Sequence, residues 1–179
     1  MRRLGVSIYP EKSTVEEIKN YLEKTSRLGF SRVFSCLLSV NKPAEEIKKE
    51  FKEFNAYAHE LGFEVIVDVS PRVFGELNIS YKDLSFFKEI GADGIRLDAG
   101  FSGLEESIMT YNPQGLIVEI NMSNNVHTLD TIMDYRPNKY KLYGCHNFYP
   151  HRYSGLNLDF YKECTKRFND YGLKTAAFV

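Results

Sequence analysis

Apolar runs and amphipathic segments alternate along the whole chain. Seven runs rich in β-branched or aromatic residues predict strands, at residues 4–10, 32–39, 63–70, 94–98, 116–123, 140–149 and 174–179. Six segments with the apolar spacing of helices lie between them, at residues 13–29, 43–62, 83–90, 103–110, 125–134 and 157–171. The strands begin about 22 to 34 residues apart, which is the length of a βα unit. This alternation predicts an α/β fold with a parallel sheet.

The first two helices carry local signals at both ends. Ser13 or Thr14 is expected to cap the first helix, and Gly29 is expected to end it. The second helix has Pro43 in its first turn and Gly62 at its end. These local signals alone predict where the helices at 13–29 and 43–62 begin and end.

A parallel sheet of this length is either an open, doubly wound sheet or a (β/α)8 barrel of the TIM type. No G-x-G-x-x-G motif follows the first strand, so the nucleotide-binding fingerprint of many open sheets is missing. Polar residues recur at the carboxyl end of nearly every strand, which favours the barrel. We therefore expect an incomplete TIM-type barrel of about seven strands and six helices.

The strand LIVEINMS carries Glu119, Asn121 and Ser123 two residues apart, so an extended chain places all three on one face. In a TIM barrel, inward residues at the carboxyl ends of the strands line the mouth that holds the active site. Unpaired buried polar groups cost about 1–3 kcal/mol each, so such a convergence indicates a site. The same alternation in the other strands predicts an inward set of Ser7, Tyr9, Ser35, Ser39, Asp68, Ser70, Arg96, Asp98, Glu119, Asn121, Ser123 and His146.

Composition and charge narrow the function. The chain has 23 basic and 24 acidic residues, a formal net charge of −1, and no concentrated basic run, so nucleic acid is not an expected partner. No segment has the pattern of a signal peptide or a membrane span, so we expect a cytoplasmic protein. The three cysteines form no C-x-x-C pair, and the histidines lack ligand spacing, so neither a disulfide framework nor a metal site is expected.

Four segments carry a resemblance to a known family: LGVSIYPEKS, RLDAGFSG, VEINMSNN and CHNFYPHRYSGL. They resemble the N-terminal barrel of the MupG-type 6-phospho-N-acetylmuramidases, a bacterial family once described as outer surface proteins or of unknown function. The likeness runs from the first strand to the last residue. It implies a cytoplasmic, cofactor-free glycosidase of peptidoglycan recycling. Such an enzyme cleaves a phosphorylated amino-sugar disaccharide, N-acetylmuramic acid 6-phosphate linked to N-acetylglucosamine.

The family pattern also implies a domain organisation. It has a complete barrel followed by a cyclophilin-like β domain, whereas residues 1–179 account for a partial barrel only. We expect the end of the barrel and the second domain to be absent from this chain. An incomplete barrel leaves an open sheet edge, which an oligomer or a partner segment is expected to cover.

Two carboxyl groups are expected to carry the glycosidase chemistry, one as acid and one as base or nucleophile. Asp98 and Glu119 close adjacent strands about 5 Å apart and are the predicted catalytic pair, with Glu119 as the acid. Asp68 is a third candidate for catalysis or for binding sugar hydroxyls. A structural reading stays open for both members of the pair: Asp98 as an ion-pair partner of Arg96, and Glu119 as a barrel-filling residue bonded to Asn121.

The remaining candidates are expected to bind substrate. His146 and Asn147 end the sixth strand, where they can hold hydroxyl or acetamido groups, and the ring of Tyr149 can cover the apolar face of a sugar. Tyr9 ends the first strand at the mouth or is a simple rim aromatic. The predicted substrate-binding set is Tyr9, Asp68, Arg96, Asn121, Ser123, His146, Asn147 and Tyr149.

Two other classes of function remain open on the sequence. A sugar-phosphate isomerase or aldolase of the same fold would use Glu119 to abstract a proton from a free monosaccharide phosphate. A non-catalytic fragment would bind sugar without turnover.

Overall fold

The computed structural model describes residues 4–98, 100–121, 142–147 and 174–178, with isolated positions at 162, 166, 169, 170 and 172. For Asn121 and for residues 142–147 and 174–178 the description covers the backbone only.

Strands and helices alternate in chain order, as the hydrophobic pattern predicts. The strands are β1 (Gly5–Ile8), β2 (Arg32–Cys36), β3 (Glu64–Val69), β4 (Gly94–Leu97), β5 (Ile117–Asn121), β6 (Leu142–Asn147) and β7 (Lys174–Phe178). The helices are α1 (Val15–Arg27), α2 (Ala44–Glu60), α3 (Pro71–Glu76), α4 (Ser85–Glu89) and α5 (Leu104–Tyr111).

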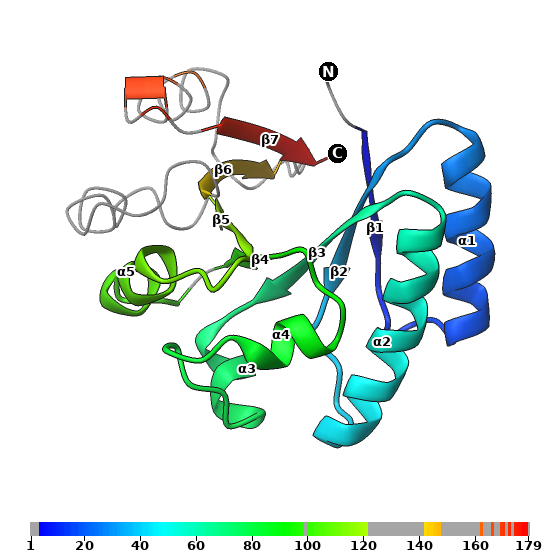
Figure 1. Cartoon of the computed structure of the whole chain (residues 1–179), viewed down its shortest axis with the longest axis horizontal. Coiled ribbons are helices and arrows are strands. Elements are labelled where there is room, and N and C mark those ends of the chain that lie inside the picture. Colours follow the sequence, from blue (N-terminus) through cyan, green and yellow to red (C-terminus); the bar gives the residue numbers. More distant parts are fainter. Residues whose placement is uncertain are drawn as a thin grey trace, which may run out of the picture.

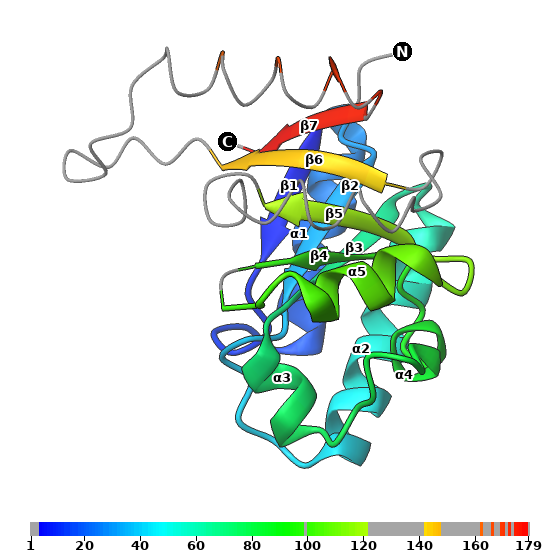
Figure 2. The same ribbon diagram turned by 90° about the vertical axis from the view of Figure 1, so that its left-hand side faces the viewer.

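All seven strands lie in one parallel sheet in the order β1-β2-β3-β4-β5-β6-β7. The sheet curves, and helices α1 to α5 follow its outer side (Figures 1 and 2). Within the described residues β1 and β7 are not paired, so the sheet is not closed. This arrangement confirms the α/β class and is that of a partial TIM-type barrel.

A side-chain capping interaction at Thr14 fixes the start of helix α1. The Thr14 hydroxyl accepts a hydrogen bond from Glu17 N at 3.2 Å, and Thr14 N donates to the Glu17 carboxylate at 2.8 Å. This reciprocal capping box shows that Thr14, rather than Ser13, is the cap. Gly29 follows the helix with φ of 85°, a conformation that favours glycine.

The main core lies between the sheet and the helices. The strands contribute Val33, Val65, Val67, Ile95 and Val118 from their outer face, all buried. The helices bury apolar side chains against them, namely Ile18, Leu22, Ile47, Phe51, Phe54, Phe87 and Ile90. Because this core takes one face of β1 to β5, the opposite face of these strands is left for the barrel interior.

Helix α3 was not predicted, and two predicted helices lie wholly or mostly outside the described residues. Helix α3 was not expected, because six residues that begin with Pro71 are too few to show a helical period. The helix expected at 125–134 lies outside the described residues, and the one at 157–171 is described at isolated positions only. The described part holds five helices, so the count of six for the chain stays a prediction.

Candidate active site

Strand register decides which side chains point into the barrel. Across β2 to β5, Cys36 pairs with Asp68, Asp68 with Arg96, and Arg96 with Glu119. These residues alternate with the core valines and isoleucines, so Asp68, Arg96 and Glu119 share the inner face, as the sequence predicts.

The prediction for β2 was wrong by one residue. Ser35 pairs with Ile8 and Val67, which belong to the outer, helix-facing core. The inner residues of β2 are therefore Arg32, Phe34 and Cys36. Ser39 lies in a turn beyond the end of this strand.

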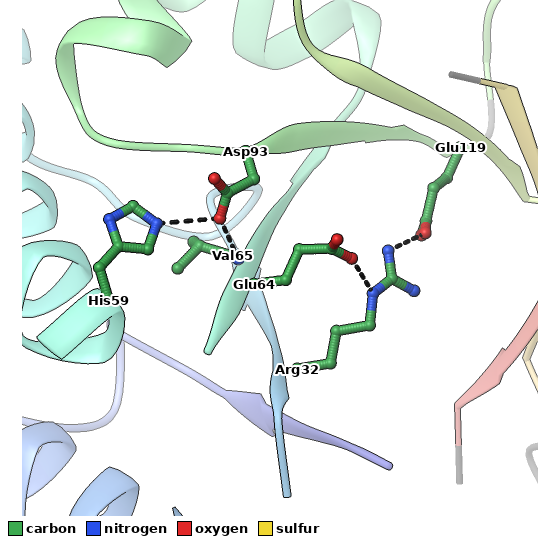
Figure 3. A network of polar contacts seen from close by, with 6 residues as sticks. All are labelled: Arg32, His59, Glu64, Val65, Asp93 and Glu119. Carbon is green, nitrogen blue, oxygen red and sulfur yellow. Dashed lines mark hydrogen bonds and ion pairs between the residues drawn. The ribbon is translucent and has the colours of Figure 1, made fainter. Parts of the chain in front are cut away.

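A buried ion-pair network joins three of these strands (Figure 3). The Arg32 guanidinium donates from Nε to Glu64 Oε1 at 2.6 Å and from a terminal nitrogen to Glu119 Oε1. Burial disfavours the charge on Arg32, but attraction to Glu119 and hydrogen bonds to both glutamates raise its pKa. Glu119 is 0% exposed, and burial raises its pKa against the opposing effect of Arg32.

Arg32 and Glu64 were not among the predicted site residues, because each lies at the start of an apolar run, away from the carboxyl end of its strand. The signal that could have found them is their phase: Arg32 is an even number of residues before Cys36, and Glu64 stands likewise to Asp68. The structure brings Arg32 to Glu119, a partner that the spacing of the two residues does not suggest.

The second part of the site centres on Asp68. Asp68 is 6% exposed, and its Oδ1 atom has no hydrogen-bond partner within the described residues. Burial raises the pKa of Asp68 to about 8, and the negative charges of Asp98 and Glu119 add to the effect while Arg96 opposes it. Asp68 and Glu119 are thus both carboxyl groups whose protonated form is favoured by burial, but within the described residues only Glu119 has an arginine bonded to it.

Arg96 and Asp98 flank this carboxyl on β4. Arg96 is 2% exposed, and its Cζ lies 4.7 Å from the centroid of the Phe34 ring, a cation–π contact. Asp98 directly follows β4, is half-buried, and its backbone N donates to Val69 O at 2.9 Å. Solvent exposure of the three carboxyl groups therefore increases from Glu119 through Asp68 to Asp98.

The mouth continues over the ends of β1 and β2. Tyr9 follows β1, is 39% exposed, and has Lys12 Nζ 5.4 Å from its ring centroid. A cavity of about 530 Å³ lies beside it, between the loops that follow the two strands. Lys12, Ser39 and Lys42 contribute to its lining. Such a polar hollow can accept a hydrophilic ligand.

The other predicted residues are described in part or not at all. Asn121 ends β5 and pairs with Cys145, whereas His146 and Asn147 end β6 and pair with Ala177 and Phe178. Ser123 and Tyr149 lie outside the described residues. The roles expected of these residues stay predictions.

The opposite end of the barrel has a second cavity, of about 570 Å³. Its lining includes His59 and Asp93, whose Nε2 and Oδ2 atoms are 2.9 Å apart. Asp93 Oδ2 also accepts a hydrogen bond from Val65 N at 2.7 Å (Figure 3). These contacts tie α2 to β3 and β4, which gives His59 and Asp93 a structural function.

The part of the chain that the structure describes shows neither a metal-ion cluster nor a membrane-spanning helix. No group of three or more histidine, cysteine, aspartate or glutamate side chains there is arranged to hold a metal ion. No helix in the same residues is both long and apolar enough to span a membrane.

The sequence pattern of the 6-phospho-N-acetylmuramidase N-terminal domain matches residues 4–179. The chain belongs to this family. Among solved structures, it is similar to an uncharacterized B. cereus protein, with 47% identity and a TM-score of 0.78 over 97% of this chain. A conserved Enterococcus faecalis protein of unknown function has 20% identity and a TM-score of 0.76 over 97% of this chain.

The chain spans about half the length of these two proteins, 46% of the B. cereus protein and 47% of the Enterococcus faecalis protein. Dispersin B matches over 98% of this chain and 74% of its own, with 10% identity and a TM-score of 0.62, which shows a shared fold. No curated protein matches the chain.

Proposed function

We propose that this chain contributes the catalytic barrel of a glycosidase. Its substrate would be the disaccharide of N-acetylmuramic acid 6-phosphate and N-acetylglucosamine, and its role would be cytoplasmic peptidoglycan recycling. The observation that carries the proposal is the convergence of Asp68, Arg96, Asp98 and Glu119 at the carboxyl ends of β3 to β5, in a chain of this family. Most glycosidases use a pair of carboxyl groups at the bond that they break, and this face supplies three whose charges interact.

The electrostatics of this face suit an oxocarbenium-like transition state. Positive charge develops on the sugar as the bond breaks, and the accessible carboxylate of Asp98 would stabilise it or activate water. Glu119, buried deeper in the barrel and paired with Arg32, would supply a second negative charge beneath the sugar. The predicted binding residues Tyr9, Asn121 and Asn147 would hold sugar hydroxyls around the mouth.

The test is an assay of the full-length protein with the phosphorylated disaccharide and with its unphosphorylated form. Release of N-acetylglucosamine, faster from the phosphorylated substrate, is the expected result. Asp98→Asn and Glu119→Gln should each lower kcat by at least about 100-fold while circular dichroism shows the fold preserved. The matched control is Asp83→Asn, an exposed carboxylate on the α3–α4 connection, which should keep the wild-type rate.

Two outcomes would refute the glycosidase. Conversion of a free monosaccharide phosphate without cleavage of the disaccharide would indicate an isomerase or aldolase. Binding of the disaccharide without turnover would indicate a non-catalytic sugar-binding function.

A further inference from the structure

Four carboxylates and two guanidinium groups share the inner face of β2 to β5. The acidic members are Glu64, Asp68, Asp98 and Glu119, and the basic members are Arg32 and Arg96. With all six ionised, this face would carry two more negative than positive charges. Because excess buried charge is costly, such a group takes up a proton instead.

Contacts with Arg32 decide which carboxyl groups stay ionised. Glu64 and Glu119 each accept a charge-assisted hydrogen bond from this guanidinium (Figure 3). Asp98 is half-buried, so water can solvate its charge. Asp68 Oδ1 and Glu119 Oε2 are both buried without a hydrogen-bond partner in the described part of the chain, and burial raises the pKa of both groups. The two differ in that Glu119 Oε1 is bonded to Arg32.

Asp68 has titratable or charged neighbours on β2, β4 and β5. Cys36 of β2 stays a neutral thiol at physiological pH, because burial raises its pKa to about 11. On β4, Asp98 repels a charge on Asp68 and Arg96 attracts it. Glu119 of β5 repels it as well, and Arg96 divides its attraction between Asp68 and Glu119. Asp68 thus faces two anions, Asp98 and Glu119, and only one cation, Arg96, which it shares with Glu119. This balance favours the protonated form of Asp68.

We infer that Asp68 holds the excess proton of this cluster at neutral pH and donates it to the glycosidic oxygen. The inference deepens the proposed glycosidase function and rests on it. It assigns to Asp68 the acid role that sequence analysis expected of Glu119, because the bond to Arg32 stabilises Glu119 as an anion.

The chemical step balances with water as the second reactant. The bond between the anomeric carbon and the glycosidic oxygen breaks, and its electron pair stays on the oxygen, which takes the proton of Asp68. A water oxygen bonds to the anomeric carbon. The Asp98 carboxylate accepts the one proton that this water loses and passes it on to the Asp68 carboxylate. The enzyme thus regains its starting protonation state.

Arg32 acts here as a positioning residue. Its bond to Glu119 stabilises the ionised form of that carboxyl group and so opposes protonation there. The proton therefore remains on Asp68, whose pKa the charge of Asp98 raises further.

Two substrates with different leaving groups test the role of Asp68 in the full-length protein. The natural phosphorylated disaccharide needs protonation of its leaving oxygen, whereas a nitrophenyl glycoside of the same phosphorylated sugar does not, since nitrophenolate is a stable anion. Asp68→Asn should lower kcat/KM for the disaccharide by about 100-fold or more and for the nitrophenyl glycoside by less than about 5-fold. Glu119→Gln should lower both to a similar degree, and Asp83→Asn should lower neither.

Equal losses for Asp68→Asn on both substrates, or the selective loss in Glu119→Gln instead, would overturn the assignment. If Asp68→Asn does not fold, the wild-type pH profile decides. The disaccharide rate should then fall above about pH 8 while the nitrophenyl rate does not, and identical profiles would refute the inference.

Infrared spectroscopy separates this inference from the proposed function. Near neutral pH the wild type should show a protonated-carboxyl band that Asp68→Asn lacks and Asp83→Asn retains. A missing band overturns the inference whatever the activity. If the wild type cleaves neither substrate, the proposed function fails, and donation by Asp68 fails with it.

Discussion

Arg32 and Glu119 form a buried ion pair although 87 residues separate them in the sequence (Figure 3). Arg32 is the first residue of β2, and Glu119 lies three strands away in β5. The same guanidinium also bonds Glu64 of β3. One side chain therefore ties three strands together inside the barrel, where water does not replace a lost partner.

Replacing Arg32 by methionine is expected to destabilise the protein by about 3–5 kcal/mol, because Glu119 would remain buried without its counter-charge. Urea unfolding of the full-length protein, followed by circular dichroism, measures the free energy of unfolding. The matched control is Arg27→Met, which removes an exposed ion pair with Glu23 on α1 and should cost less than about 1 kcal/mol.

A double variant separates charge from packing in this network. Arg32→Met combined with Glu119→Leu should recover most of the stability that the single change loses, because a buried pair replaced by apolar groups is often neutral. A double variant as unstable as Arg32→Met would show that lost packing, rather than an unpaired charge, causes the effect.

The cap of α1 makes a second, local prediction. Thr14→Ala should lower the free energy of unfolding by about 1 kcal/mol, since it removes the hydroxyl that accepts a hydrogen bond from the first turn. Ser13→Ala, at the neighbouring exposed position, should change it by less than about 0.5 kcal/mol. A larger loss for Ser13→Ala would mean that the helix starts one residue earlier than the structure shows.

Local signals explain why the longer helices were predicted well. The expected segments 13–29 and 43–62 contain α1 and α2, because caps, terminal glycines and apolar spacing act within one element. The phase of β3 to β5 was also predictable, since the two-residue period of a strand is fixed by chain geometry.

The interior network was not predictable from such patterns. In β2 Ser35 occupies the helix-facing side, against the expectation that polar strand residues point inward. Arg32 does point inward, but it lies at the start of the strand, away from the carboxyl end where polar residues were expected. The pairing of Arg32 with Glu119 depends on how the sheet curves, which no single strand encodes. Sequence patterns located the carboxylates, but the charges that control them required the fold.

Gly94 gives a prediction about packing inside the barrel. A Cβ atom there would lie 2.6 Å from Ile117 O and 2.8 Å from Ile66 Cδ1, closer than such atoms approach. Gly94→Ala should therefore destabilise the protein by about 1–3 kcal/mol, as measured by thermal or urea unfolding. Gly75→Ala in α3 is the control, because nothing lies within 4 Å of its Cβ position, and it should be neutral or slightly stabilising. Equal stability of the two variants would contradict the close approach of β4 and β5.

The last prediction concerns the pH dependence that Asp68 imposes on stability. Its pKa is about 8 in the folded protein and 3.8 for an ordinary aspartate, so between these values the folded state binds a proton that the unfolded state releases. The free energy of unfolding should therefore fall as pH rises from about 4 to 8, with a contribution from Asp68 of up to about 1.4 kcal/mol per pH unit. Asp68→Asn should flatten this slope and be more stable than the wild type at the alkaline end, because it removes a buried charge. Asp83→Asn should keep the wild-type slope across this window, since hydrogen bonds with Ser85 lower the pKa of Asp83. Urea unfolding at a series of pH values measures all three slopes, and a wild type with the slope of Asp68→Asn would show that Asp68 is ionised in the folded protein.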